Sequence, residues 1–369
     1  MSFVKVDLDK ILDNFKKTAK KVKGKKVYCV VKSNAYGCGA SVVARELQKV
    51  GANGFVVANV TEGVNLRKNG VKTPILVLGF TGVKDFWALK KYDLTQSVFC
   101  FEYLQKVCDC VQKTGDSVKI WLKFNCGFNR VGFDIDQINK AFDLLYGFRD
   151  KVVVTGVFSH LRSGLMPQSR LKQVLKSQLD TFYKLKKQAQ KHPFFCKNQS
   201  VEWSILNSVG VGIGLNAFDV VRVGASLYGL GGSGYDCEWE FFARLLQVNY
   251  LKKGQSVGYD DSFVAKKDCF VGVLDVGYAD GLPRRATESG LKVFVGGKYC
   301  PIVGSVCMNH SFVLLPQKLK NFCKVEVVGR HIPPQSVAKK LNTIDYEIYC
   351  RFGKNSPFIY KKTAKNKGN

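Results

Sequence analysis

Polar and reactive side chains stand near the ends of several short β-rich runs in this sequence. Lys32 ends VYCVVK, Lys123 lies in VKIWLKF, His160 follows Ser159 in VVVTGVFSHL, and Arg222 lies in DVVRVGASLYG. One lysine or histidine at such a place is usually a solvated strand end or a hydrogen-bonded core residue. Several of them at the same end of successive strands favour a common site, because active sites of parallel barrels form at the carboxyl ends of the strands.

The position of Lys32 indicates a particular chemistry. An apolar strand desolvates its amine, which lowers the pKa and suits the lysine to form a Schiff base. Ser208 begins SVGVGIG and Gly224 lies in RVGAS, so hydroxyl and backbone N–H groups after two later strands are available to a phosphate. We therefore expect a phosphate-bearing cofactor.

Eight β-rich runs alternate with helix-like segments, and this alternation predicts a barrel. The runs cover 27–32, 54–58, 74–79, 95–100, 118–124, 152–161, 201–208 and 219–229. Amphipathic segments separate most of them, but the gap between the last two holds no comparable helix. Alternating strands and helices imply parallel pairing, and eight units close a barrel in roughly 200–250 residues. We predict an α/β fold whose (β/α)8 TIM barrel covers residues 1–232.

The pattern changes after the glycine-rich stretch 229–240, which is typical of a linker. Later segments are β-like with short turns, and only SVAKKLN (336–342) suggests a helix. We therefore predict a smaller, mostly β C-terminal domain over residues 233–369.

Charge and cysteine content narrow the class of protein. The net charge is +28, but the lysines are scattered and no recognition motif accompanies them, so we expect no specific nucleic-acid partner. Thirteen cysteines without a CxxC pair, and only four histidines, predict no metal site. No apolar run approaches the roughly 20 residues of a membrane helix, and no signal peptide is visible. We expect a cytoplasmic protein without a membrane partner.

Several motifs resemble those of the alanine racemase family over nearly the full chain: VVKSNAYGCG, RVGASLYG, GYDDSF, VGYADGLPR and PIVGSVCM. The resemblance implies a pyridoxal 5'-phosphate (PLP) enzyme that interconverts L- and D-alanine, supplying D-alanine as for cell-wall peptidoglycan. It implies that Lys32 carries the cofactor and removes the α-proton of the D-enantiomer. Tyr259 would act on the opposite face from a second subunit, so the expected assembly is a head-to-tail homodimer.

Further roles follow only from the resemblance. Arg222 would face the pyridine nitrogen, and His160 would link Arg222 to Tyr259. Arg130 and the backbone N–H of Met308 would bind the substrate carboxylate, with Tyr278 narrowing the entrance. Lys123 matches a lysine that is carbamylated in some members and orients the arginine corresponding to Arg130. The cofactor-binding residues would be Lys32, Tyr36, His160, Ser208, Arg222, Gly224, Ala225 and Tyr346.

These roles are physically coherent. Racemisation needs proton removal on one face and return on the other, hence two bases. A tyrosine, with a pKa of about 10, can serve if neighbouring positive charge lowers that pKa. PLP stabilises the carbanion. An arginine at the ring nitrogen cannot accept its proton, which weakens the electron sink and should suppress transamination.

The sequence departs from the family pattern at three positions. Cys38 stands where His usually follows AYG, Asn125 replaces a carboxylate beside Lys123, and Asn309 replaces a carboxylate near the substrate site. None removes a catalytic group, so we expect an active enzyme. The alternatives are a PLP-dependent decarboxylase, whose specific motifs are not visible, a single-domain PLP-homeostasis protein, against which the second domain speaks, and a polyanion-binding protein without enzymatic activity.

Overall fold

The computed structural model describes residues 1–162, 168–196 and 200–363. Contacts divide the chain into two compact units. The barrel unit comprises Leu12–Ser33 and Ala40–Leu227, and the β unit comprises Met1–Ile11, Asn34–Gly39 and Tyr228–Asn369. The predicted boundary at 232/233 stays a prediction. Among the described residues, no helix is both long enough and apolar enough to cross a membrane.

Eight parallel strands form the sheet of the barrel unit, in the order β8-β7-β6-β5-β4-β3-β2-β9. The two end strands, β8 and β9, are joined by backbone hydrogen bonds from Asp219 to Trp203 (3.0 Å) and from Arg222 to Leu206 (3.0 Å), which nearly closes the barrel. The predicted (β/α)8 class is therefore confirmed. The strands are β2 (Lys26–Val30), β3 (Gly54–Val57), β4 (Ile75–Val77), β5 (Thr95–Val98), β6 (Val118–Lys123), β7 (Val152–Phe158), β8 (Glu202–Ser204) and β9 (Val220–Val223).

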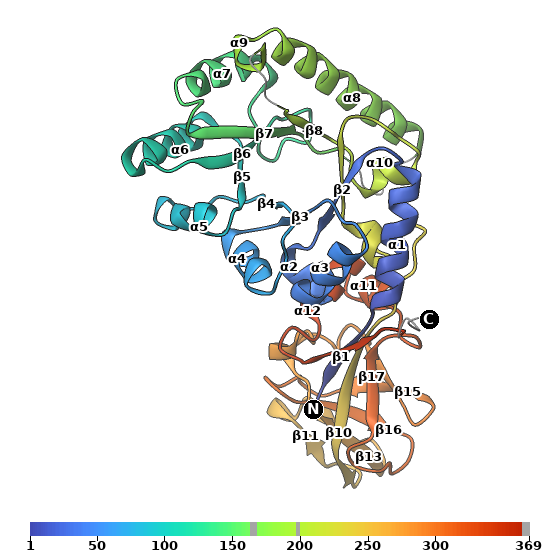
Figure 1. Ribbon diagram of the computed structural model, residues 1–369. Helices are drawn as coiled ribbons and strands as arrows, with labels where there is room; N and C mark the ends of the chain where they lie inside the picture. Colours follow the sequence, from blue (N-terminus) through green and yellow to red (C-terminus); the bar gives the residue numbers. More distant parts are fainter. Residues whose placement is uncertain (163–167, 197–199, 364–369) are drawn as a thin grey trace, which may run out of the picture. The chain divides into compact units, whose positions relative to one another are not determined.

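Helices lie outside these strands (Figure 1). They are α3 (Ala40–Lys49), α4 (Val60–Lys68), α5 (Phe86–Lys91), α6 (Phe101–Thr114), α7 (Ile138–Tyr146), α8 (Gln168–Gln190), α9 (Pro193–Cys196) and α10 (Ser208–Gly212). Helix α6 shows why they pack there, because Leu104, Val107 and Val111 lie on one buried face at helical spacing. Only the five-residue α10 lies between the last two strands, as the missing helical pattern predicted.

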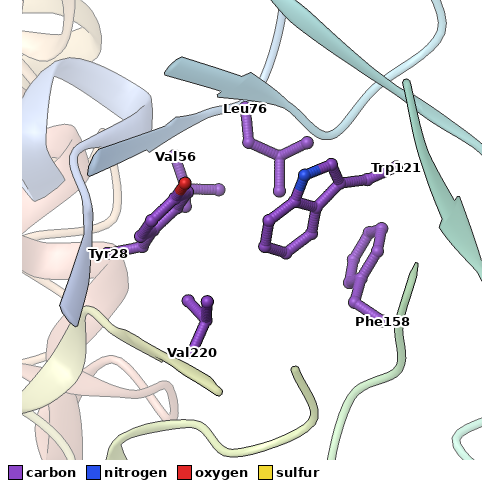
Figure 2. Packing of buried hydrophobic residues seen from close by; sticks show 6 residues of the cluster. All are labelled: Tyr28, Val56, Leu76, Trp121, Phe158 and Val220. Atoms are coloured by element: carbon purple, nitrogen blue, oxygen red, sulfur yellow. The ribbon is translucent and has the colours of Figure 1, made fainter. Parts of the chain in front are cut away.

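The interior of the barrel is filled by side chains that converge from six strands (Figure 2). The Trp121 ring lies 5.5 Å from that of Tyr28 and 5.9 Å from that of Phe158. Gly156 makes room for the indole, because a Cβ atom there would lie 2.3 Å from it. At the edge of this apolar cluster, the Arg222 guanidinium lies 4.9 Å from the Phe158 ring. The six residues are Tyr28, Val56, Leu76, Trp121, Phe158 and Val220.

Six strands of the β unit form a closed ring, because β13 pairs both with β16 and with β10. Around this ring the order is β10-β13-β16-β15-β14-β17, and every pairing in it is antiparallel. The bounds are β10 (Trp239–Leu251), β13 (Cys269–Leu274), β14 (Lys292–Val295), β15 (Lys298–Val303), β16 (Ser311–Leu315) and β17 (Lys324–Val328), with the hairpin of β11 (Ser256–Val257) and β12 (Phe263–Val264).

Strands from the beginning and from the late part of the sequence pair in the β unit. Strand β1 (Phe3–Asp7) pairs antiparallel with β10 and parallel with β18 (Phe358–Lys361), and helix α1 (Leu8–Lys21) follows it. The mostly β character is confirmed, but the prediction of a single helix is wrong. The unit contains α11 (Pro334–Lys340) and also α12 (Asp345–Arg351), whose Ile348 and Tyr349 are buried.

Candidate active site

Lys32 begins a left-handed turn directly after β2. The segment α2 (Lys32–Gly37) contains four successive non-glycine residues, Ser33 to Tyr36, whose φ angles are 53–55°. Left-handed helical backbone costs roughly 1–2 kcal/mol for each such residue, so neighbouring groups must hold it. Within the turn, the Gly39 N–H donates to the Asn34 carbonyl (2.9 Å) and the Cys38 N–H to the Ala35 carbonyl (3.0 Å).

Glu62, in helix α4, anchors the start of this turn. Its Oε1 accepts the Ser33 N–H (2.8 Å), and its Oε2 accepts the Ala58 N–H at the end of β3 (2.8 Å). Its own N–H donates to Asn59, the N-cap of the helix (2.9 Å). One carboxylate therefore ties the residue after Lys32 to the neighbouring strand, and the sequence analysis did not find it.

If Lys32 carries PLP, as the resemblance implies, Glu62→Gln should weaken PLP binding about 10-fold, because one amide oxygen cannot replace both acceptors and hydrogen bonds to charged groups contribute about 1.5–3 kcal/mol. Titration of the apoenzyme with PLP, followed by the imine absorbance, measures this. Glu46→Gln is the matched control, because Glu46 pairs with Lys49 of its own helix α3 (2.7 Å). Equal PLP affinity in both variants would contradict a positioning role for Glu62.

Four cations gather at the carboxyl ends of the barrel strands. Burial lowers the pKa of Lys123 to about 8, helped by the charges of Arg130, Arg222 and Lys32. Burial also lowers the pKa of His160 to about 3, and the same cations contribute. All the charges that shift these two pKa values are positive. The carboxyl ends of these strands are therefore suited to bind an anion. His160 is neutral at physiological pH.

Arg222 is buried on β9 and is held by the strands beside it. It donates to the Ser204 hydroxyl of β8 and to the Ser159 carbonyl after β7. Burial lowers its pKa to about 9, so it remains charged near neutral pH. Within the part of the chain that the structure describes, no direct hydrogen bond joins Arg222 to His160, and the expected link through His160 stays a prediction.

Arg130 lies in a loop that leaves and re-enters the end of β6. Backbone bonds from Asn125 to Phe133 (2.8 Å) and from Phe133 to Lys123 (2.9 Å) close this loop. The Asn125 carboxamide accepts from the backbone N–H groups of Gly127 (3.2 Å) and Asn129 (3.0 Å). Asn125 therefore shapes the turn before Arg130, whose guanidinium lies 4.4 Å from the Phe128 ring.

Ser208 and Gly224 meet after β8 and β9. The Ser208 Oγ accepts the Gly224 N–H (3.0 Å) and the Ser226 N–H (3.3 Å), and lies 3.2 Å from the Ser226 hydroxyl. Ala225 lies between these donors, at the start of the 3-10 turn Ala225–Tyr228. Hydroxyl and N–H donors that converge in this way can bind phosphate oxygens.

Tyr36 and Tyr346 lie near each other in the β unit. Their ring centroids are 6.1 Å apart, and the Tyr228 ring is 4.9 Å from that of Tyr36. Burial raises the pKa of both Tyr36 and Tyr346, so their hydroxyls stay protonated and can donate to an oxyanion. Gly231 has φ 63°, and a Cβ atom there would lie 2.4 Å from the Tyr346 hydroxyl.

Three loops of the β unit carry Tyr259, Tyr278 and Met308. The first two loops are each tied to the third. The Ser305 N–H donates to the Ser262 hydroxyl (2.8 Å), and the Tyr278 N–H donates to the Cys307 carbonyl (3.0 Å). All three side chains are exposed, and Tyr259 most of all, at 66%.

Sequence comparisons identify relatives over both units. The profile described as "Alanine racemase, N-terminal domain" matches residues 6–231, and "Alanine racemase, C-terminal domain" matches residues 239–360. The alanine racemase of Ligilactobacillus salivarius is 32% identical over 370 residues, covering 96% of this chain and 97% of the relative.

Two solved structures share the fold over almost the whole chain. The Bacillus anthracis alanine racemase with bound L-Ala-P has a TM-score of 0.88 at 26% identity, covering 99% of this chain and 96% of that one. The Bartonella henselae alanine racemase, solved with covalently bound pyridoxal phosphate, has a TM-score of 0.80 at 26% identity, covering 98% and 99%.

Proposed function

The chain belongs to the alanine racemase family, and from this premise we propose that it interconverts L- and D-alanine with PLP as cofactor. The observation that carries the proposal is the group of cations around Lys32 at the end of β2, whose charges also lower the pKa of Lys123 and His160. The proposal includes a cytoplasmic location and the supply of D-alanine for cell-wall peptidoglycan.

The residues present fit PLP, which carries an aldehyde and a phosphate. A cation group stabilises an anion, and Ser208 and Gly224 bring a hydroxyl and an N–H group together as phosphate donors. When bound, PLP supplies the electron sink that stabilises a carbanion. We assign its covalent attachment to Lys32, and its other contacts to Tyr36, His160, Ser208, Arg222, Gly224, Ala225 and Tyr346.

Arg222 and His160 have distinct roles in this proposal. Arg222 stays charged, so with PLP bound it would donate to the ring nitrogen and could not take up its proton. This would keep the electron sink weak and limit transamination. His160 is neutral, with its pKa lowered to about 3, so it adds no positive charge beside Arg222.

The two proton-transfer groups are Lys32 and Tyr259. Lys32 removes the α-proton of D-alanine, and Tyr259 removes that of L-alanine on the opposite face. Arg130 and the Met308 N–H hold the substrate carboxylate, and Tyr278 narrows the entrance. The exposure of Tyr259 supports its use by a second subunit, because its ring is not packed within its own unit.

A head-to-tail homodimer has a measurable consequence. If Tyr259 serves the Lys32 of the other subunit, mixed Lys32→Ala and Tyr259→Phe proteins should recover up to about one quarter of wild-type activity, because a heterodimer holds one site with both groups. The assay is racemisation after dissociation and reassembly. Replacing the second protein by the double variant is the control and should give no recovery. Absence of recovery despite proven subunit exchange would place both groups in one chain.

We propose that Lys123 is carbamylated. With a pKa near 8, part of it is an uncharged amine at neutral pH, and that amine attacks CO2 to give a carbamate anion and release a proton. Arg130 and Arg222 stabilise the anion. We expect a 13C carbamate signal from labelled bicarbonate that grows as the pH rises from about 7 to 8. Lys123→Ala should remove it, and Lys119→Ala, on the exposed part of the same strand, should not. A signal that persists in Lys123→Ala would contradict the assignment.

The function is tested by the chirality of the product. With PLP, L-alanine and D-alanine should each yield the same equal mixture of enantiomers, because enantiomers have equal free energy. An imine band near about 420 nm should accompany this activity. Release of CO2 with no D-alanine would favour the decarboxylase alternative, and absence of both activity and imine band would refute the proposal.

A further inference from the structure

The β unit contains a groove apart from the residues assigned to racemisation. It has a volume of about 900 Å³ and lies against strands β13, β15 and β16, with the β11–β12 hairpin beside it. None of its lining residues is among those assigned to PLP or alanine. This volume is within the range of roughly 300–1,000 Å³ that is usual for small-molecule sites.

Apolar side chains line much of the groove. Phe270 of β13 and Leu314 of β16 are partly exposed, while Tyr250 of β10 and Tyr299 of β15 contribute exposed aromatic rings. The rings of Tyr250 and Phe270 lie 5.3 Å apart, so the aromatic surface is continuous there. Single exposed apolar residues need no explanation, but several in one concave place usually mark a binding site.

Positive charge dominates the groove. Lys266, Lys267 and Lys298 are exposed lining residues, and Asp268 is the one carboxylate among the described residues that line it. Asp268 is engaged within the β unit, because it accepts the Tyr250 hydroxyl (2.6 Å) and the Lys253 N–H (2.9 Å). The Tyr250 bond and the Lys253 bond together lower the pKa of Asp268. Little negative charge in the groove therefore offsets the positive charge of the three lysines, which favours the binding of an anion.

The hydroxyl groups of the groove also have protein partners. The Tyr299 hydroxyl donates to the His331 carbonyl (3.1 Å), and the Ser262 hydroxyl donates to the Tyr259 carbonyl (2.9 Å). Hydroxyls engaged in this way are poorly placed to recognise the edge of a nucleobase or sugar. The groove can therefore select a ligand by its apolar body and its negative charge.

We propose that this groove binds a free amphiphilic anion, with an alkyl or aryl body on the apolar strands and a carboxylate or phosphate head at Lys266, Lys267 and Lys298. The net charge of +28 raises the local concentration of such anions at low ionic strength. The site is separate from the proposed function, so the failure of one leaves the other standing.

Displacement of 8-anilinonaphthalene-1-sulfonate from the PLP-loaded protein tests this site. Decanoate should displace the dye, decanol should be at least about 10-fold weaker, and decyltrimethylammonium should be weaker still. Lys266→Gln/Lys267→Gln/Lys298→Gln should raise the decanoate Kd about 10-fold. Lys292→Gln/Lys318→Gln/Lys320→Gln changes the charge equally at exposed lysines outside the groove and should leave the Kd unchanged. Racemisation rates report correct folding and should be equal in both.

A second variant tests the apolar part. Leu314→Trp fills the groove and should weaken decanoate binding while the lysines remain. Equal losses in the two lysine variants, equal binding of decanol and decanoate, or no displacement at all would each overturn the proposal. Binding to phosphatidylglycerol vesicles that needs the three groove lysines, without binding of decanoate, would also overturn it and assign the surface to a bilayer.

Discussion

In deuterated water, Tyr259→Phe should lose α-proton exchange from L-alanine far more than from D-alanine. The reason is that Tyr259 is assigned to the face from which the L-proton leaves, while Lys32 still faces the D-proton. Loss of one proton-transfer group costs about 10²–10⁴ in rate, so the asymmetry should be large. The measurement is the loss of the α-proton NMR signal of each enantiomer over time.

The control for this experiment is Tyr278→Phe. Tyr278 is also exposed but is assigned to the entrance, so its variant should affect both enantiomers alike and only modestly. If Tyr259 merely packed or held phosphate, extra PLP would restore exchange of both enantiomers. Equal loss for L- and D-alanine at saturating PLP would therefore reject the assigned role of Tyr259.

Lys32→Ala should abolish both racemisation and the PLP adduct that borohydride traps. Lys123 is the other lysine that could form the PLP adduct. Its pKa is lowered to about 8, so more of it is the nucleophilic uncharged amine, and it belongs to the same group of charges as Lys32. Loss of the attached lysine removes the covalent link and one proton-transfer group, so activity should fall by about 10⁴ or more.

Lys123→Ala is the matched control and should keep the adduct at residue 32. Peptide mapping after reduction distinguishes the two amines directly. A full adduct on another lysine in the Lys32→Ala protein would refute the assignment of Lys32, whatever the family resemblance implies.

The barrel could be predicted because its strands are short apolar runs bounded by turn residues. The run that ends at Lys32 contains four buried residues of strand β2 and its end, Val27, Tyr28, Cys29 and Val31. Such runs are typical of parallel strands with both faces covered. The positions of Lys123, His160 and Arg222 near strand ends then predicted that they share one site, but their individual roles depended on the resemblance.

Features that depend on distant contacts could not be predicted. TIDYEIYC is rich in residues that also suit strands, and the helix α12 forms where Tyr349 stacks on Trp239 at 4.6 Å. In SNAY only Asn34 readily tolerates left-handed backbone and there is no glycine, so four successive positive φ angles could not be predicted. Glu62 was missed because its two acceptor bonds are to backbone groups, which carry no sequence signal.

The pairing of β1 with β18 has a consequence for biosynthesis. The register pairs Val4 with Phe358 and Asp7 with Lys361, so β1 must wait for the synthesis of a strand that lies far along the chain. Synthesis proceeds at about 5–20 residues per second, which leaves the β18 edge of β1 uncovered for tens of seconds on a ribosome. A nascent chain with an unpaired strand edge is prone to aggregation, and chaperone occupancy should be highest during this interval. Loss of the residues from 358 onward would make that transient exposure permanent.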